Sequence, residues 1–455
     1  MNGETVQERA AAAERAVHNL LLRDGQPVVV VDSPPGAGKT RLVEAITGVA
    51  AISCGLRVAV ATARAEQSYE LIRRLMVDFP TLRVQPLTPE DRPIPRDLQT
   101  DPRLVTSSNR PANLASGALA VVATAAKLET SLPFFGQLPA FDVMITDEAY
   151  QLQFKQLANL QAVATQMLLV GDPGQLPPFS RIETSRFDAA FSKVHWPGPK
   201  EILRIYGSDI PVVQLPASWR FTQDTVELLQ PGFYPTLPFE SALSSAQRQL
   251  TLVAAGMGDG IDRALDALSN GASIVVVIAP PKLLAPEQID EELAQLQAQI
   301  VQRAITRGAT WEGVRRLTER DIGCADAHVA SGAALRRELL GMNISVDPST
   351  GVLVETPEIW QGLQRPLMVV KHPLSGLRRI DEFALEPGRA CVMLSRHQLG
   401  CLVVTRAGIA DALDDYQHDS GARPTGSEDM IWAGREAHWA LWNELERRSR
   451  IFSVN

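Results

Sequence analysis

The sequence predicts an α/β fold in which helices cover both faces of parallel sheets. Apolar runs of strand length alternate with segments of helical periodicity along most of the 455 residues. The alternation pauses near residues 205–212 and then restarts, which indicates two such domains in tandem. The composition, with 45% hydrophobic and 21% charged residues, is that of a globular protein and excludes a wholly disordered or fibrous chain.

The first domain is expected to span residues 1–207. Its expected helices share apolar residues at helical spacing: 5–22, 41–52 and 66–79. Its expected strands share short apolar runs: 27–32, 56–62, 118–124, 141–147 and 166–172. Residues 86–111 are polar and rich in proline, so we interpret them as a surface excursion and not as a folded insert.

The second domain is expected to span residues 208–410. Its expected strands again share short apolar runs: 212–216, 250–256, 273–280, 321–327, 342–346, 365–372 and 401–405. A helix is expected between them at 286–308. The tail 411–455 begins as a polar loop and ends in a helix at 428–448 that is expected to pack on this domain. Its Trp432, Trp439 and Trp442 share one face, which indicates core packing or, alternatively, a partner surface.

Charge and cysteine content restrict the classes of function. The net charge of −8 argues against a basic protein that coats nucleic acid, but it allows a local basic groove. Cys54, Cys324, Cys391 and Cys401 have no zinc-site spacing, so we expect buried thiols in a reducing cytoplasm and no zinc. The longest apolar runs have strand length and the N-terminus does not resemble a signal peptide. We therefore expect a cytoplasmic protein without a membrane span.

The string SPPGAGKT at 33–40 carries the strongest chemical signal. It lies between a valine-rich strand and a helix that begins near Lys39, which is the context that a P-loop requires. Backbone N–H groups of Gly36 to Lys39 can surround a β-phosphate at the positive end of the helix. Lys39 can reach the β- and γ-phosphate oxygens, and the Thr40 hydroxyl can bind Mg²⁺. We expect ATP and Mg²⁺ to bind at the following residues: Pro35, Gly36, Ala37, Gly38, Lys39, Thr40 and Arg41.

Two further strand ends carry polar residues suited to phosphate chemistry. The run FDVMITDEAYQ at 141–151 ends in Asp147, which can hold Mg²⁺ through water, and Glu148, which can accept a proton from the attacking water. The run LLVGDPGQLPPF at 168–179 places Gln175 on a tight loop, where its side chain can sense the γ-phosphate. The sequence therefore predicts an ATP hydrolase.

These motifs lead to a family. DEAYQ and GDPGQLPP resemble superfamily 1 helicases and translocases, in the DEA-x-Q branch (superfamily 1B) that contains the nonsense-mediated-decay helicase. LPASWRF at 215–221, followed by PGFYPTL, resembles that branch's motif IV. TPEIWQG at 356–362 resembles motif V, and CVMLSRHQLGCLVV at 391–404 resembles motif VI. The motifs stand in family order over residues 28–405.

The resemblance implies two tandem RecA-like domains with minimal accessory inserts, ATP between them and single-stranded nucleic acid across both. Arg220 and Arg396 would act as arginine fingers, and Gln175 would couple hydrolysis to the polymer. Gly362 of motif V would border the nucleotide. The resemblance places nucleic-acid contacts at the following residues: Thr62, Arg64, Thr124, Trp360 and Gln361.

The sequence departs from the family at several of these contacts. Motif Ia reads TARAE at 62–66, where Glu66 would repel a phosphate. Gln364 stands where the family has a glutamate near the ribose, and no glutamine that reads adenine is recognisable before the P-loop, so the base specificity stays open. The aromatic candidates for stacking on bases are Trp311, Trp360 and Phe179, although core packing is the favoured interpretation for Trp360.

We therefore expect an ATP-dependent motor on single-stranded nucleic acid, with DNA as the favoured polymer and 5′→3′ movement implied by the resemblance. The alternative is a non-translocating ATP-driven switch that controls a partner protein, for example a co-encoded one. A small-molecule kinase is disfavoured because it would not need the motif IV to VI series.

Overall fold

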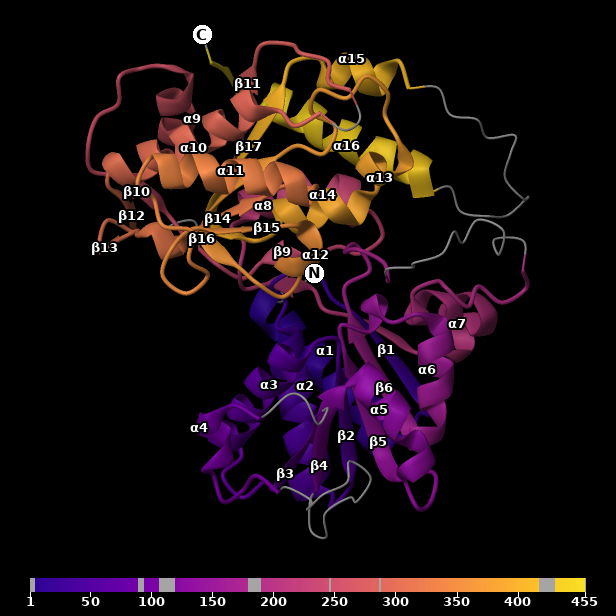
Figure 1. Ribbon diagram of the computed structural model, residues 1–455. Coiled ribbons are helices and arrows are strands. Elements are labelled where there is room, and N and C mark those ends of the chain that lie inside the picture. Colours follow the sequence, from indigo (N-terminus) through magenta and orange to yellow (C-terminus); the bar gives the residue numbers. More distant parts are fainter. Residues whose placement is uncertain are drawn as a thin grey trace. The chain divides into compact units, whose positions relative to one another are not determined.

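The chain divides into two compact units, each of which is described by itself (Figure 1). The computed structural model describes residues 5–88, 94–105, 119–178, 190–244, 247–285, 288–416 and 430–454. The first unit comprises Met1–Pro173 and Pro177–Ala217, and the second comprises Gly174–Leu176 and Ser218–Asn455.

The first unit is built on a seven-stranded sheet in which every described strand pair is parallel. Its order is β3-β4-β2-β5-β6-β1-β7. The strands are β1 (Val28–Asp32), β2 (Val58–Thr62), β3 (Val84–Leu87), β4 (Ala120–Thr124), β5 (Phe141–Asp147), β6 (Ala164–Gly171) and β7 (Val212–Gln214). The α-helices are α1 (Val6–His18), α2 (Lys39–Gly48), α3 (Ala65–Asp78), α4 (Arg96–Gln99), α5 (Ala125–Ser131), α6 (Phe154–Leu160) and α7 (Gly198–Tyr206).

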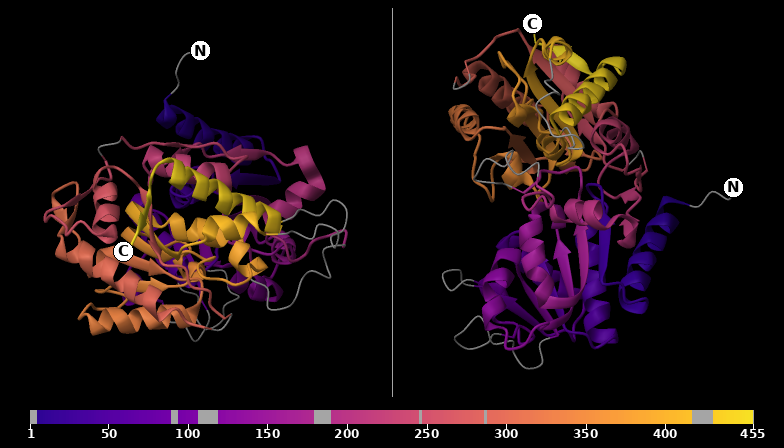
Figure 2. Two further views of the ribbon diagram at one scale, coloured as in Figure 1. Left: turned by 90° about the horizontal axis from the view of Figure 1, so that it is seen from above. Right: turned by 90° about the vertical axis from the view of Figure 1, so that its right-hand side faces the viewer.

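Helices cover both faces of this sheet, and the strand sequences explain why (Figure 2). Val29 and Val31 face one hydrophobic cluster, which α1, α2 and α3 complete, whereas Val30 faces a second cluster with α5 and α6. Strands buried on both faces need continuous apolar runs instead of alternating ones. The predicted α/β class with parallel sheets is confirmed.

Two details of the first unit differ from the prediction. Pro86 belongs to β3, an edge strand of the sheet, so the proline-rich excursion begins only after Leu87. An edge strand tolerates proline because one side of it needs no ladder hydrogen bond. The first unit also runs to Ala217 instead of residue 207, because β7 pairs with β1.

The second unit contains a six-stranded parallel sheet of order β15-β14-β16-β17-β11-β18. Its strands are β11 (Ile274–Ala279), β14 (Ile322–Ala325), β15 (Leu353–Glu355), β16 (Arg365–Lys371), β17 (His397–Arg406) and β18 (Ile451–Ser453). A small antiparallel sheet lies outside it, formed by β10 (Leu250–Leu252), β12 (Ala309–Trp311) and β13 (Arg315–Arg316). The short strands β8 (Ala217–Ser218) and β9 (Glu240–Ser241) pair with each other.

Helices also cover both faces of the second sheet. One hydrophobic cluster holds residues of α8 (Gln223–Phe233), α13 (Glu382–Leu385), α14 (Pro387–Leu394), α15 (Ile409–Asp414) and α16 (Met430–Arg447). The other holds residues of α9 (Gly260–Ser269), α10 (Glu291–Thr306) and α11 (Val329–Gly341). The short α12 (Pro357–Trp360) follows β15.

The strand expected at 342–346 does not form. Asn343 has a left-handed backbone with φ 57°, which is incompatible with an extended run at that position. The expected strand at 250–256 is shortened to β10 and belongs to the small antiparallel sheet with β12 and β13.

The C-terminal helix α16 packs on the second unit against α8, α13, α14 and α15. Its tryptophans divide between the two interpretations: Trp442 is buried, whereas Trp432 and Trp439 are about two-fifths exposed, at 42% and 39%. Three of the four cysteines are buried free thiols, and Cys54 is exposed, contrary to expectation. Among the helices that the structure describes, none is long and apolar enough to cross a membrane.

Candidate nucleotide-binding site

The strand order of the first unit gathers the predicted catalytic motifs at one edge of the sheet. β1 lies beside β6, and β6 lies beside β5, so the three strands are neighbours. Because they are parallel, their carboxyl ends share one edge, which is where α/β folds bind ligands. The segments that follow these strands are the P-loop, the Asp147–Glu148 pair and Asp172.

The P-loop has the backbone that phosphate binding requires. Gly36 and Gly38 have left-handed backbones, with φ 78° and 88°, which residues with a Cβ adopt at a cost. Gly38 caps α2, and Lys39 is the first residue of that helix. The first-turn amides of a helix have no partners within the helix, so they are directed at a bound anion. Ser33, which replaces the usual glycine, is fully buried, and its hydroxyl donates to the Pro34 carbonyl at 3.2 Å.

The Lys39 ammonium lies between two carboxylates. Its Nζ is 3.8 Å from Glu148 Oε1 and 3.8 Å from Asp172 Oδ2, and only 10% of the Lys39 side chain is exposed. Asp172 was not among the sequence-predicted site residues. Its position directly after β6, the neighbour of β1, is the signal that could have identified it. This arrangement holds the ammonium beside the P-loop, where the oxygens of a bound phosphate can replace the two carboxylates as its charge partners.

The turn after β5 concentrates strain and unsatisfied charge. Glu148 has a left-handed backbone, with φ 59° and ψ 44°, which is uncommon for a residue other than glycine and is concentrated at functional sites. Asp147 is buried, and its Oδ1 has no hydrogen-bond partner among the described residues. Burial raises the pKa of the Asp147 carboxyl, and the neighbouring Glu148 raises it further. A divalent cation would relieve both costs, so Asp147 fits the predicted Mg²⁺ site, for which Thr40 in the first turn of α2 is the other predicted ligand.

Within the second unit, the two predicted arginine fingers contact the same residue. Arg220 donates from Nη1 to the Ser395 carbonyl at 2.9 Å. Arg396 is almost fully buried and donates from Nη2 to the Ser395 hydroxyl at 3.0 Å. The residues are far apart in sequence, so the fold of the second unit brings them together. Sequence reasoning overlooked the neighbouring Trp219, which is 41% exposed and would offer a flat apolar face beside Arg220.

Gln175 belongs to the second unit although the rest of its strand-and-loop motif belongs to the first. Gln361 Nε2 donates to the carbonyl of Leu176 at 3.4 Å. A Cβ at Gly388 would lie 2.6 Å from the carbonyl carbon of Gln175, so α14 packs closely on this loop. The predicted motif III loop therefore contacts Gln361 of motif V and Gly388 of α14 within the second unit.

The motif V residues separate into a turn and a core residue. Gly362 has a left-handed backbone with φ 84°, and its position after α12 requires this turn. Trp360 is fully buried, and its Nε1 donates to the Cys324 carbonyl at 2.9 Å. Its indole ring is thus a core residue, which was the favoured interpretation. The nucleic-acid contact that the resemblance placed at Trp360 is corrected, because no face of the ring is open to a base.

The candidate nucleic-acid contacts of the first unit lie at the ends of β2 and β4. Thr62 is buried, and its hydroxyl bonds the Arg64 carbonyl at 2.9 Å and Ser68 Oγ at 2.6 Å. The Thr124 hydroxyl accepts from the Lys127 amide at 3.2 Å and caps α5. Arg64 is half-buried and precedes α3 as its N-cap. Both hydroxyls are therefore engaged in local structure.

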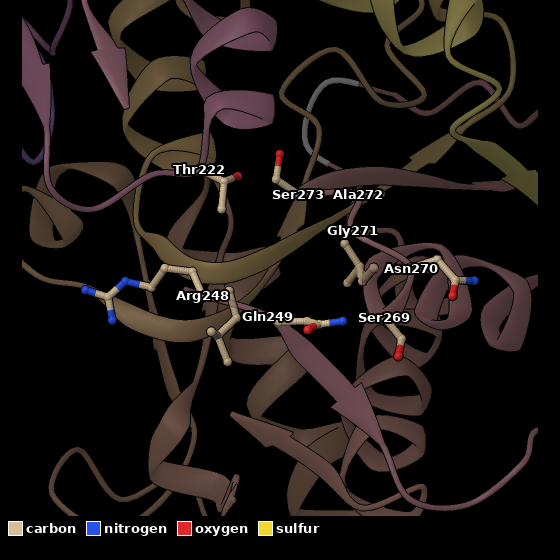
Figure 3. A pocket seen from close by; sticks show the side chains of 10 residues that line it. Thr222, Arg248, Gln249, Ser269, Asn270, Gly271, Ala272 and Ser273 are labelled. Carbon is tan, nitrogen blue, oxygen red and sulfur yellow. The ribbon is translucent and has the colours of Figure 1, made fainter. Parts of the chain in front are cut away.

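A separate cavity of about 460 Å³ lies in the second unit (Figure 3). Apart from two leucines, it is lined by polar and small residues around the end of α9: Thr222, Arg248, Gln249, Leu268, Ser269, Asn270, Gly271, Ala272, Ser273 and Leu399. The Arg248 guanidinium lies 4.8 Å from the centre of the Trp311 ring, and Arg315 lies 5.4 Å from it. Trp311 is therefore packed against two arginines, and Phe179, the other aromatic candidate, lies outside the described residues.

Comparison with known proteins agrees with the P-loop assignment. Residues 10–187 match the AAA domain family. This segment includes the P-loop, Asp147–Glu148 and Gln175, and the match supports a P-loop fold for the first unit. A comparison with curated proteins finds no match.

Several solved helicase structures are similar to the chain at low identity. They include the helicase of PRRSV (14% identity, TM-score 0.40, 87% of this chain and 54% of that one). They also include Arterivirus nonstructural protein 10, a helicase in complex with DNA (13%, 0.41, 88% and 65%), and the Escherichia coli DEAH/RHA helicase HrpB (11%, 0.41, 87% and 42%). The chain spans less than two thirds of each of these proteins, and the likeness concerns the fold alone.

Proposed function

We propose that this protein is an ATP-dependent motor on single-stranded nucleic acid, with DNA as its polymer. The observation that carries the proposal is the Lys39 ammonium, held at the P-loop between Glu148 and Asp172 with the buried carboxylate of Asp147 beside them. This is the set of groups that ATP hydrolysis needs: a cation for the phosphates, a base for water and a carboxylate for a metal ion. The order of the motifs along residues 28–405 supports the motor assignment.

The first unit would supply the hydrolytic groups. The P-loop amides and Lys39 bind the β- and γ-phosphates, and Glu148 accepts a proton from the attacking water at its carboxylate. Thr40 and Asp147 would hold Mg²⁺, which when bound neutralises charge on the phosphate oxygens. The left-handed backbone of Glu148 fixes the direction of its side chain before the substrate arrives.

The second unit would supply charge stabilisation and coupling. Arg220 and Arg396 would stabilise the charge that develops on the γ-phosphate, as arginine fingers from the same chain. Asp172 contacts Lys39, and Gln175, three residues later, belongs to the second unit. We propose that this loop transmits the loss of the γ-phosphate to the second unit, and that repeated cycles move the polymer 5′→3′.

The competing function is an ATP-driven switch that controls a partner protein without translocation. Thr62 and Trp360, two of the expected polymer contacts, are engaged inside their own units, and this observation favours the switch. The two functions share the hydrolytic site and differ only in what hydrolysis moves.

Displacement of streptavidin from biotinylated oligonucleotides separates the two functions. A 5′→3′ motor displaces streptavidin from the 3′ end of a single-stranded DNA oligonucleotide in the presence of ATP and Mg²⁺, and the Glu148→Gln variant does not. An RNA oligonucleotide in parallel identifies the polymer. Active ATP hydrolysis without displacement from either end of either polymer would contradict the motor and support the switch.

A further inference from the structure

A hydrogen bond beside the P-loop joins two residues to which the sequence analysis gave no role. Tyr150 Oη donates to Asp32 Oδ1 at 2.6 Å, although the residues are 118 positions apart. Asp32 is the last residue of β1 and directly precedes the P-loop. Tyr150 lies two residues after Glu148, in the short turn Ala149–Gln151. The bond therefore ties the turn that carries the catalytic carboxylates to the start of the P-loop.

The Tyr150 ring is also fixed against the third strand of the site. A Cβ at Gly171, the last residue of β6, would lie 2.8 Å from Tyr150 Cδ2 and 3.0 Å from the Tyr150 amide nitrogen. The Gly171 carbonyl in turn accepts from the Ser33 amide at 3.0 Å. Only 7% of Tyr150 is exposed. One aromatic side chain thus contacts the ends of β1 and β6 while it belongs to the turn after β5.

The surroundings of Tyr150 keep its hydroxyl protonated, so that it can donate to Asp32. Burial raises the pKa of the Tyr150 hydroxyl well above its usual range, and the carboxylate of Asp32 raises it further, so the hydroxyl keeps its proton. Asp32 is itself beside Asp172, the second carboxylate at Lys39. An O–H donor to a carboxylate at this distance is among the stronger hydrogen bonds of proteins, and its partial burial strengthens it.

We infer that Tyr150 is a positioning residue for ATP hydrolysis, which acts through Asp32 to hold Glu148 in register with the P-loop. The inference rests on the proposed ATPase function. Glu148 stands in a strained left-handed conformation that the surrounding structure must maintain, and the Tyr150–Asp32 hydrogen bond two residues later is one of the contacts that can maintain it. The Tyr150–Asp32 hydrogen bond involves neither the backbone amides of the P-loop nor Lys39. Its loss should therefore slow the chemical step and leave nucleotide binding intact.

The test is steady-state ATP hydrolysis by Tyr150→Phe, which keeps the ring on Gly171 and removes only the hydroxyl. We expect kcat to fall about ten-fold while the KM for ATP changes by less than about two-fold, because a small displacement of a catalytic group affects the transition state alone. Tyr206→Phe, which removes a half-exposed hydroxyl on α7 of the same unit, is the matched control and should leave both constants unchanged.

A double-mutant cycle tests the route through Asp32. Asp32→Asn keeps an acceptor for the phenol and should retain most of the rate, whereas Asp32→Ala should match Tyr150→Phe. The double variant Asp32→Ala/Tyr150→Phe should be no slower than the slower single variant, because both changes break one interaction.

The outcomes separate the inference from the function beneath it. A wild-type protein that binds ATP but does not hydrolyse it overturns both the proposed function and the positioning role. Wild-type hydrolysis with an unchanged kcat in folded Tyr150→Phe overturns only the positioning role. The two single variants could also lose kcat equally, with the two losses multiplied in the double variant. That result would show two independent structural effects and would overturn the positioning role. Thermal melting of each variant verifies that the comparison is made on folded protein.

Discussion

Two parts of the carboxyl edge of the first unit's sheet differ in how their polar groups are bonded. At the ends of β1, β5 and β6, Asp147 has a carboxylate oxygen with no hydrogen-bond partner in the described part of the chain, and Glu148 has a strained backbone. At the ends of β2 and β4, the Thr62 and Thr124 hydroxyls are already bonded to neighbouring residues. The first group retains binding capacity at a cost in stability, whereas the second has used it for local structure.

This difference shows how strongly the structure supports the two parts of the proposed function, nucleotide hydrolysis and polymer binding. A buried carboxylate oxygen without a partner among the described residues is costly, so its presence on Asp147, two strands from the P-loop strand, indicates that a ligand completes it. The hydroxyls at β2 and β4 give no such indication, because their hydrogen bonds explain their presence. The structure therefore supports the nucleotide site more strongly than it supports the polymer contacts.

We expect the largest effect on ATP turnover from substitutions in the nucleotide site. Lys39→Ala and Glu148→Gln should each abolish ATP turnover, a loss of roughly 10³-fold or more, because one removes the phosphate cation and the other the base. Lys39→Ala should also lose nucleotide binding, and Glu148→Gln should retain it. Steady-state hydrolysis and fluorescent-nucleotide titration measure these quantities, with the exposed Lys155→Ala on α6 as the control. Retained hydrolysis by Glu148→Gln would remove Glu148 as the base.

The arginine pair of the second unit comes next. Arg220→Ala and Arg396→Ala should each lower kcat by roughly 10³-fold with a smaller change in nucleotide affinity, because an arginine finger acts on charge that develops in the transition state. Lysine at either position should rescue poorly, since it lacks the planar fork of donors. Single-turnover hydrolysis measures the chemical step, and a rate within ten-fold of wild type in both alanine variants would exclude the arginine-finger role.

A moderate effect on stability is expected at Thr62. Thr62→Val removes a hydroxyl that bonds the start of α3 and should lower the free energy of unfolding by about 1 kcal/mol. Because the hydroxyl is engaged internally, affinity for single-stranded DNA should stay unchanged. Urea denaturation and fluorescence anisotropy provide the two measurements. A clear loss of affinity with unchanged stability would mean that this strand end contacts the polymer after all.

The smallest expected effect is at Arg64. If this side chain contacts one phosphate, Arg64→Ala should reduce the slope of log affinity against log salt concentration by about 0.7, the contribution of one contact on a single strand. Arg83→Ala, an exposed arginine before β3 at the opposite edge of the sheet, is the control. An unchanged slope and unchanged affinity at low salt would exclude Arg64 as a polymer contact.

The sequence predicted what depends on local pattern. The P-loop, the Asp147–Glu148 pair and most strands were visible because glycine spacing and apolar runs determine them locally. The left-handed Glu148, the contact between Asp172 and Lys39 and the Tyr150–Asp32 bond were not visible, because they depend on which strands become neighbours. The place of Gln175 in the second unit depends on the packing of α14, which no local pattern encodes.

Stretches that resemble strands in composition were also ambiguous. Residues 212–214 have the apolar character of a strand of either domain, and only their pairing with β1 assigns them to the first. Trp360 carried the spacing of a family motif, but its burial against Gly323 and Cys324 gives it a core role. Motif position alone could not distinguish a buried indole from an exposed one.

The most direct test of the account is the ATP hydrolysis rate of the wild-type protein with and without single-stranded DNA or RNA, at fixed low salt and saturating Mg²⁺. We expect at least one single-stranded polymer to raise the ATP hydrolysis rate several-fold, and duplex DNA of the same length to leave it unchanged. A rate that both single-stranded polymers leave unchanged, but that a co-encoded protein alters, would contradict the motor and support the switch.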